Sequence, residues 1–398
     1  MIVRERYLRR IRPFIDDDLV KVLTGIRRCG KSVILKQIES ELKAKGKKTL
    51  TLNFEDLAVS SIIRTDGDLL AYVEKFLGED KLYVFLDEVQ AVQNWNIACR
   101  TLRLKNLSLF ITGSNSKLLS REFTKELSGR YVSFQIRPFV FKEIEAYTRQ
   151  LGREADIDDY IVYGGFPKVQ EQMPDKEAVR QYLNDLDQTI VMYDIMNRYR
   201  VKKTELFRRL VNFVLLSNAQ IFSAAAVLRA LKGEGFECTL NTVMKFLGYL
   251  TEAYVIREVP QYSGKAKREL RYYRKIYDED VAFNSIRQQG NRFDYTHNLE
   301  NIVFNELIYM GYEVYVFTDG DKEIDFLAIK DKKEYMVQVA WSIVEESTYQ
   351  REFALFNKLD GSRKKIIITN DTMDFSTTTV THIQLKDFLR MESLQEAG

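Results

Sequence analysis

The residues with the most specific chemical pattern form GIRRCGKS, which spans Gly25 to Ser32. A β-rich run, 19–24, precedes this segment, and apolar residues at helical spacing follow it. Gly25 and Gly30 let the backbone curl so that its amides point at phosphate oxygens, and the next helix adds its positive amino end. The spacing GxxxxGKS therefore predicts a loop that binds ATP together with Mg²⁺.

Each residue type in this loop has its own predicted task. Lys31 reaches the β- and γ-phosphates, and the Ser32 hydroxyl binds Mg²⁺. An ordinary turn before a helix has a similar composition, but the correctly placed strand and helix favour phosphate binding. The predicted ATP contacts are Gly25, Ile26, Arg27, Arg28, Cys29, Gly30, Lys31, Ser32 and Val33.

An acidic pair follows the apolar run 83–86, which is typical of a buried parallel strand. Asp87 and Glu88 end this strand at the edge where open α/β sheets bind ligands. We expect Asp87 to hold Mg²⁺ through water and Glu88 to polarise the attacking water as the general base. The alternative is an acidic pair that only caps the next helix.

The order of the motifs along the chain resembles a known family. The motifs are YLRRI, LTGIRRCGKS, LNFED, VFLDEVQ, LFITGSNSKLLS, LSGRY, RPFVFKEI and YGGFP. Together they look like the prokaryotic AAA-type P-loop ATPases whose C-terminal half carries a domain of unknown function similar to PD-(D/E)xK nucleases. The resemblance covers nearly the whole chain, and it implies ATP binding and hydrolysis.

The resemblance adds two catalytic positions. In AAA-type ATPases a polar side chain after the strand that follows the acidic pair senses the γ-phosphate and orients water. In this chain the strand is within LFITGSNSKLLS, so the resemblance implies this role for Ser114 or Asn115. Helix capping explains both residues about as well. Arg130, with Arg137 as the second choice, is a candidate to stabilise the γ-phosphoryl group of a neighbouring copy, or else a surface arginine. An arginine acting in trans favours a homo-oligomer, while a monomer with cis contacts stays open.

Length and composition allow several domains. The 398 residues include 45% apolar side chains, which excludes a disordered chain. The predicted fold class is α/β: a P-loop NTPase (AAA-like) domain, then a helical and winged-helix segment, then a C-terminal α/β restriction-endonuclease-like domain. The predicted boundaries are 1–150 for the ATPase domain, 151–200 for a helical lid or linker, 201–285 for the winged helix and 286–398 for the nuclease-like domain.

Basic character is concentrated in one segment. The whole chain has a formal net charge of +3, whereas 198–275 contains 16 Lys or Arg against 6 Asp or Glu, a net charge of +10. Its end, KAKRELRYYRK, interleaves basic residues such as Arg274 and Lys275 with tyrosines, which suits phosphate contacts. We expect this segment to bind DNA mainly through contacts with the DNA phosphate backbone and not with the bases. The alternative is a winged helix used only for domain packing.

The C-terminal third carries only part of a nuclease pattern. Glu300 and Asp325 stand where the resemblance places the first two acids, but the third element reads Gln338, Val339, Ala340. A hydrolytic site needs carboxylates to neutralise its metal ion, so the loss of one acid and the lysine predicts an inactive nuclease fold. The alternative is a cation that reaches the site from the adjoining turn, from Lys330, Lys332 or Lys333.

Three scattered cysteines and two histidines form neither a disulfide framework nor a zinc pattern. No run has the length of a signal peptide or membrane helix, so we expect a cytoplasmic protein with no membrane partner. The predicted function is an ATP-binding and ATP-hydrolysing molecular switch that acts on or with nucleic acid. The alternatives are a non-catalytic DNA-binding or protein-docking regulator with a structural nucleotide site, and an ATP-gated nuclease.

Overall fold

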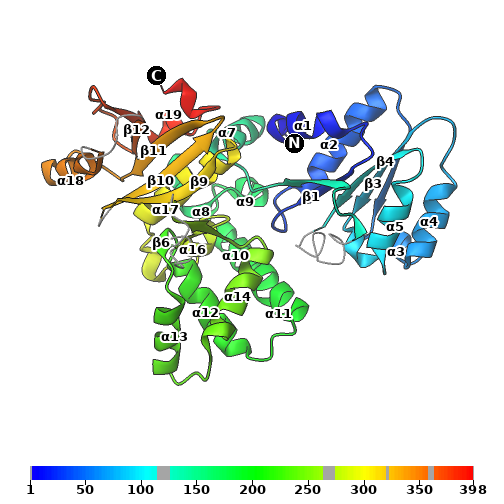
Figure 1. Cartoon of the computed structure of the whole chain (residues 1–398), viewed down its shortest axis with the longest axis horizontal. Coiled ribbons are helices and arrows are strands. Elements are labelled where there is room, and N and C mark those ends of the chain that lie inside the picture. The colour runs from blue at the N-terminus through cyan, green and yellow to red at the C-terminus, as the bar shows by residue number, and fades with distance from the viewer. Residues whose placement is uncertain (1, 114–125, 263–273, 320–321, 357–362, 398) are drawn as a thin grey trace. The chain divides into compact units, whose positions relative to one another are not determined.

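The chain divides into two compact units, Met1–Pro138 with Glu252–Tyr254, and Phe139–Thr251 with Val255–Gly398. Figure 1 shows the chain and labels many of its helices and strands. None of the helices that can be described has the length and apolar character needed to cross a membrane. The computed structural model describes residues 2–113, 126–262, 274–319, 322–356 and 363–397.

The first unit is built on a parallel sheet of five strands in the order β2-β3-β4-β1-β5. Three of them, β1, β3 and β4, are buried along their whole length, as expected for central strands of a covered parallel sheet. This arrangement confirms the predicted α/β class for the first unit. The strands are β1 (Val20–Thr24), β2 (Thr49–Asn53), β3 (Leu82–Asp87), β4 (Leu107–Thr112) and β5 (Tyr131–Gln135). The α-helices described in this unit are α1 (Glu5–Ile11), α2 (Lys31–Ala44), α3 (Leu57–Ser60), α4 (Asp66–Glu74) and α5 (Trp95–Leu102).

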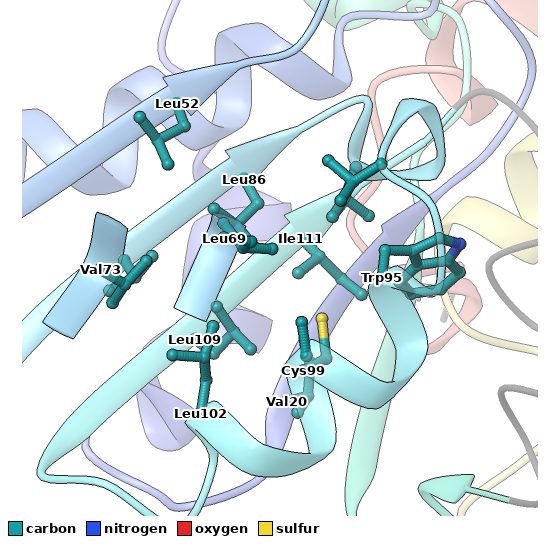
Figure 2. Packing of buried hydrophobic residues seen from close by; sticks show 14 of the residues in the cluster. Val20, Leu52, Leu69, Val73, Leu86, Trp95, Cys99, Leu102, Leu109 and Ile111 are labelled. Atoms are coloured by element: carbon teal, nitrogen blue, oxygen red, sulfur yellow. The ribbon is translucent and has the colours of Figure 1, made fainter. Parts of the chain in front are cut away.

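One hydrophobic cluster joins this sheet to α4 and α5, as Figure 2 shows. Leu86 and Ile111 come from the neighbouring strands β3 and β4, and both are fully buried. Leu69 of α4 and Cys99 of α5 belong to the same cluster and are equally buried. Burial of a Leu or Ile side chain contributes about 1.5–3 kcal/mol. The cluster therefore holds the carboxyl ends of these strands in a fixed register.

The second unit begins with a helical segment and continues with three helices and a small antiparallel sheet. The first helices are α7 (Phe141–Gln150), α8 (Ile157–Tyr163), α9 (Pro167–Gln172), α10 (Lys176–Asp187) and α11 (Ile195–Arg198), with π-helical turns at Gln188–Asp194. The next helices are α12 (Thr204–Leu216), α13 (Ala224–Gly233) and α14 (Leu240–Glu252). The sheet has the order β6-β8-β7, with β6 at Gln220–Ile221, β7 at Ile256–Pro260 and β8 at Arg274–Asp278.

A mixed five-stranded sheet, in the order β13-β12-β11-β10-β9, forms the rest of the second unit. In this sheet β10 is antiparallel to both β9 and β11, whereas β12 is parallel to β11 and β13 is parallel to β12. The strands are β9 (Glu313–Asp319), β10 (Lys322–Lys330), β11 (Lys333–Val339), β12 (Lys364–Thr369) and β13 (Val380–Gln384). The helices of this part are α16 (Ala282–Ser285), α17 (Tyr295–Tyr309), α18 (Glu346–Phe356) and α19 (Leu385–Phe388).

The two glycines of the YGGFP motif are explained by close packing within the second unit. A Cβ atom on Gly164 would lie 1.6 Å from Oδ1 of Asp280, and one on Gly165 would lie 1.9 Å from the carbonyl oxygen of Phe139. Oδ2 of Asp280 accepts a hydrogen bond from the Gly165 amide at 2.8 Å. Only glycine leaves room for these contacts, so the motif has a structural role here.

Asp278, at the end of β8, is a fully buried carboxyl group. Neither of its side-chain oxygens has a hydrogen-bond partner among the described residues. Its backbone is well bonded, because its amide donates to Asn301 Oδ1 at 2.8 Å and its carbonyl accepts from Asn301 Nδ2 at 3.0 Å. Burial raises the pKa of Asp278 well above its usual value, and Arg287 opposes this effect only in part.

We expect the substitution Asp278→Asn to change how stability depends on pH. In the unfolded chain Asp278 loses its proton near pH 4, whereas its raised pKa in the folded protein delays that loss. Between these two pKa values the wild type loses up to about 1.4 kcal/mol of stability per pH unit. An asparagine side chain at this position cannot titrate. The difference in unfolding free energy between the variant and the wild type should therefore grow in favour of the variant from pH 5 to pH 8, measured by urea unfolding. A difference that stays constant with pH would contradict this.

Candidate nucleotide site

The glycine loop between β1 and α2 is tightly constrained. Gly25 and Gly30 have φ values of 130° and 102°, in the range that favours glycine. A Cβ atom on Gly25 would lie 2.0 Å from the carbonyl oxygen of Ile136, just after β5. Gly30 is the N-cap residue of α2, which begins at Lys31. The loop therefore passes so close to the neighbouring chain segment that position 25 requires glycine.

Lys31 lies inside the curve of this loop. Its side chain is buried, and Nζ donates hydrogen bonds to the carbonyl oxygens of Gly25 at 3.1 Å and Ile26 at 3.0 Å. Ser32 follows it in the first turn of α2 and is half-buried. The amides of a first helical turn have no intrahelical acceptor. This donor set, an ammonium beside backbone amides, is complementary to a polyphosphate chain.

The other predicted contacts of the loop divide into buried and exposed side chains. Ile26 and Cys29 are fully buried. Arg27 lies 3.7 Å from Glu55, measured from Nη2 to Oε1, and Arg28 is exposed with a left-handed φ of 67°. Val33 is half-buried in α2. None of these side chains has a phosphate-binding contact of the kind that Lys31 offers, so their expected role rests on their backbone amides.

Arg4 was not predicted from the sequence, and it ties the loop to the strand beside it. Its guanidinium is buried, and Nη1 donates to the carbonyl oxygens of Cys29 at 2.9 Å and Arg137 at 3.0 Å. The guanidinium also lies over the ring of Tyr7, 4.6 Å from its centroid. The Tyr7 hydroxyl in turn accepts a hydrogen bond from the Arg137 amide at 3.2 Å. The amino-terminal segment therefore fixes both sides of the loop.

The acidic pair lies at the same edge of the sheet. Asp87 is buried at the end of β3. The hydroxyl of Thr112, which ends β4, donates to Oδ1 of Asp87 and accepts a hydrogen bond from the Glu88 amide at 3.1 Å. Thr112 is also the register partner of Leu23 in β1, two residues before the glycine loop begins. One hydroxyl thus fixes both acidic residues beside the strand that leads into the loop.

Glu88 has an uncommon backbone conformation. Its φ and ψ are 54° and 43°, in the left-handed region that residues with a Cβ atom rarely occupy. Its side chain accepts a hydrogen bond from Gln90 Nε2. Strained backbone of this kind persists where surrounding contacts hold it, and it is concentrated at functional sites. Here the Thr112 hydroxyl is one of those contacts.

The structure places the remaining predicted residues in different ways. Ser114 and Asn115 lie outside the described residues. Arg130 is exposed and precedes β5, whose first residue pairs with Val20 at the amino end of β1. The length of a five-residue strand, about 16 Å, separates it from the edge that carries the loop. Arg137 is buried. A contribution of Arg130 to nucleotide chemistry would thus require a second copy of the chain.

The donors at this edge fit ATP and Mg²⁺. The Asp87 carboxylate and the Ser32 hydroxyl are hard oxygen ligands of the kind that Mg²⁺ prefers. The glycine loop and the Lys31 ammonium supply the donors that phosphate oxygens require.

One prediction about the DNA-binding residues, that for Lys275, is wrong. Lys275 is 5% exposed, so the prediction that it contacts phosphate is wrong. Arg274 is paired with Glu258, 3.2 Å from Nη1 to Oε2, and 263–273 lies outside the described residues. Glu300 of α17 and Asp325 of β10 do lie together, since both accept a hydrogen bond from Lys275 Nζ. Oε1 of Gln338 accepts a hydrogen bond from the Asp325 amide at 3.2 Å.

We expect Thr112→Val to lower the unfolding free energy of the protein by about 1–3 kcal/mol, because it leaves the buried Asp87 oxygen and the Glu88 amide without this partner. Thr112→Ser keeps the hydroxyl and should recover most of that loss, although it removes a buried methyl group. The measurement is denaturant unfolding of the three proteins. Equal losses in the valine and serine variants would show that the hydroxyl is not what fixes the acidic pair.

Comparison with known proteins adds two family matches. A family described as an AAA domain matches residues 17–145, and a domain of unknown function (DUF8612) matches residues 154–286. Among solved structures, DnaA from Aquifex aeolicus bound to AMPPCP is 14% identical, with a TM-score of 0.33, and covers 63% of this chain and 90% of that chain. A score of this size supports no inference about function.

Two relatives match most of the chain. The uncharacterized protein MJ1544 of Methanocaldococcus jannaschii is 28% identical over 379 residues, which is 88% of this chain and 82% of the relative. An uncharacterized protein of Haemophilus influenzae is 34% identical over 382 residues, 93% of each chain. Given the AAA domain at its amino end and this degree of identity, the chain belongs to the same family of AAA-type P-loop proteins as the Haemophilus influenzae protein.

Proposed function

We propose that the protein binds ATP with Mg²⁺ and hydrolyses it, and that it works as a nucleotide-driven molecular switch. The observation that carries this proposal is the placement of Lys31, Asp87 and Glu88 around one sheet edge. Lys31 lies within the glycine loop, and a single threonine hydroxyl holds the two acids at the end of a neighbouring pair of strands. A purely structural nucleotide pocket has no use for the second carboxylate, which favours an enzyme over a non-catalytic regulator.

The chain's own residues have distinct tasks in this reaction. The Lys31 ammonium exchanges the carbonyl oxygens of Gly25 and Ile26 for phosphate oxygens when ATP binds. Ser32 and Asp87 would hold the metal ion, which would supply positive charge that offsets the charge of the phosphates. Glu88 orients the attacking water and accepts its proton.

We expect Lys31→Ala to impair ATP binding and Glu88→Gln to impair only the hydrolytic step. Lys31→Ala should weaken ATP binding and remove most hydrolysis, because the loop loses its positive charge. Glu88→Gln should lower the turnover rate by about 10²–10⁴-fold while ATP affinity stays unchanged, because only the general base is removed. The measurements are ATP titration by calorimetry and phosphate release.

Lys36→Ala is a matched control for these variants, because Lys36 is an exposed lysine of the same helix. It should leave both ATP affinity and turnover at the wild-type level. Hydrolysis at the wild-type rate in Glu88→Gln would support the alternative of a regulator with a structural nucleotide site. Hydrolysis at the wild-type rate in Lys31→Ala as well would reject the site itself.

We further propose that the basic segment gives the switch a nucleic-acid partner. Three helices and the β6-β8-β7 sheet are the elements of a winged helix, in the order in which this fold arranges them, and this supports the domain assignment made from the sequence. The segment 198–275 carries a net charge of +10. The exposed basic residues that carry this proposal are Lys202, Arg229, Lys232 and Lys245.

We expect replacement of these four side chains by glutamine to weaken DNA binding and to reduce its salt dependence. With fewer phosphates neutralised, fewer counterions are released on binding. The measurement is a filter-binding titration with duplex and single-stranded DNA at several salt concentrations. Glutamine at Lys36, Lys45, Lys47 and Lys48, four exposed lysines of the first unit, removes the same charge and should leave binding unchanged. Equal loss in both variants, or no DNA binding by the wild type, would contradict the proposal.

A further inference from the structure

A lysine lies at the centre of the acidic residues of the C-terminal sheet. Nζ of Lys275, in β8, is 2.9 Å from Oε1 of Glu300, 2.7 Å from Oε1 of Glu323 and 3.2 Å from Oδ1 of Asp325. Both Glu300 and Asp325 are buried, as is the lysine. Three carboxylates from α17 and β10 therefore converge on one ammonium that comes from the preceding small sheet.

Further contacts fix the orientation of these carboxylates. The Tyr277 hydroxyl, also in β8, donates to Oε1 of Glu300 at 2.6 Å. Oδ2 of Asp325 accepts a hydrogen bond from the Val339 amide at 3.0 Å. Asp325 also lies where the register between β9 and β10 shifts, between Ile324 and Leu327, and such irregularities re-aim side chains. The Tyr277 hydroxyl thus helps to orient the Glu300 carboxylate toward Lys275, and the Val339 amide does the same for the Asp325 carboxylate.

The distances in this cluster are those of an ammonium and not of a metal ion. Hydrogen bonds from an ammonium to carboxylates span 2.7–3.2 Å here, whereas Mg²⁺ holds its oxygen ligands at about 2.0–2.1 Å. Both cations need the same central position, so each excludes the other. Within the described residues, no group of three or more His, Cys, Asp and Glu side chains is arranged to hold a metal ion.

The electrostatic balance also favours the lysine. Three carboxylates around one buried position repel one another, and an ammonium among them offsets that repulsion. Burial and the nearby Asp325 raise the pKa of Glu300 to about 7, while Lys275 opposes this rise. The three carboxylates raise the pKa of Lys275 despite its burial, so the ammonium stays charged at neutral pH. The cluster is therefore stable with a permanent cation that belongs to the chain.

We propose that Lys275 is the resident cation of this acidic site and occupies the central position that a divalent metal ion would need there. The residues thus do not fit a metal centre while the lysine is in place. The site is non-hydrolytic for this reason, in addition to the neutral Gln338 and Ala340. Lys275 instead joins β8, and with it the basic segment, to the C-terminal sheet.

The test is Mn²⁺ binding without nucleotide, measured by calorimetry. Every protein in the test carries Asp87→Asn, which removes the metal ligand of the nucleotide site. The background protein should bind no Mn²⁺ at this cluster. Adding Lys275→Ala should create one Mn²⁺ site, because three carboxylates then face an open position, and adding Asp325→Asn should abolish that site. Lys330→Ala is the matched control, since Lys330 also lies at this sheet but donates to the Met310 carbonyl at 2.8 Å. It should create no site.

Two outcomes would overturn the proposal: Mn²⁺ binding by the Asp87→Asn protein that disappears with Asp325→Asn, or a folded Lys275→Ala protein that gains no Mn²⁺ site. A second measurement covers the case in which Lys275→Ala does not fold. Acetylation of the native wild type, read by peptide mass spectrometry, should leave Lys275 protected with and without Mn²⁺ at about 10 mM, a concentration that saturates all but the weakest divalent-ion sites. Labelling of Lys275 that rises with Mn²⁺ would show that metal displaces the ammonium and would also overturn it.

Discussion

The parallel register of β1, β4 and β3 is the constraint on which the nucleotide site depends. Leu23 pairs with Thr112, and Leu86 pairs with Ile111, so the three strands end at the same level. The glycine loop leaves one of these ends, and the acidic pair leaves another. Thr112 ends the strand between them, and its hydroxyl converts this alignment into hydrogen bonds. Without the shared register, residues far apart in the chain would have no reason to meet.

Each unit contains a buried cation whose lost hydration is replaced by oxygen atoms of the protein. A buried charge is stable only when carbonyl or carboxylate oxygens replace the water that it loses. In the first unit, Arg4 finds the carbonyl oxygens of Cys29 and Arg137. In the second, Lys275 finds three carboxylates. Each cation joins segments that are distant in sequence, so each fixes tertiary structure as well as a local site.

The division of labour between the units follows from these contacts. The first unit brings together the groups that ATP chemistry requires. The second unit presents exposed basic side chains on its helices, and Lys275 occupies its acidic cluster. In the proposed switch, the first unit therefore carries the site for ATP, and the second unit carries charges that suit binding and assembly.

The sequence by itself determined the glycine loop, the acidic pair after a buried strand and the α/β class, because loop geometry and hydrophobic periodicity are local properties. It also indicated that Glu300 and Asp325 belong together. Only the tertiary structure decided the roles of Arg4, Thr112 and Lys275. Arg4 and Lys275 lie in basic segments that are typical of solvated surface, and the oxygen atoms that bury them come from residues 25 to 133 positions away. No local pattern records such a partner, because the free energy of a buried charge depends on what the fold places around it.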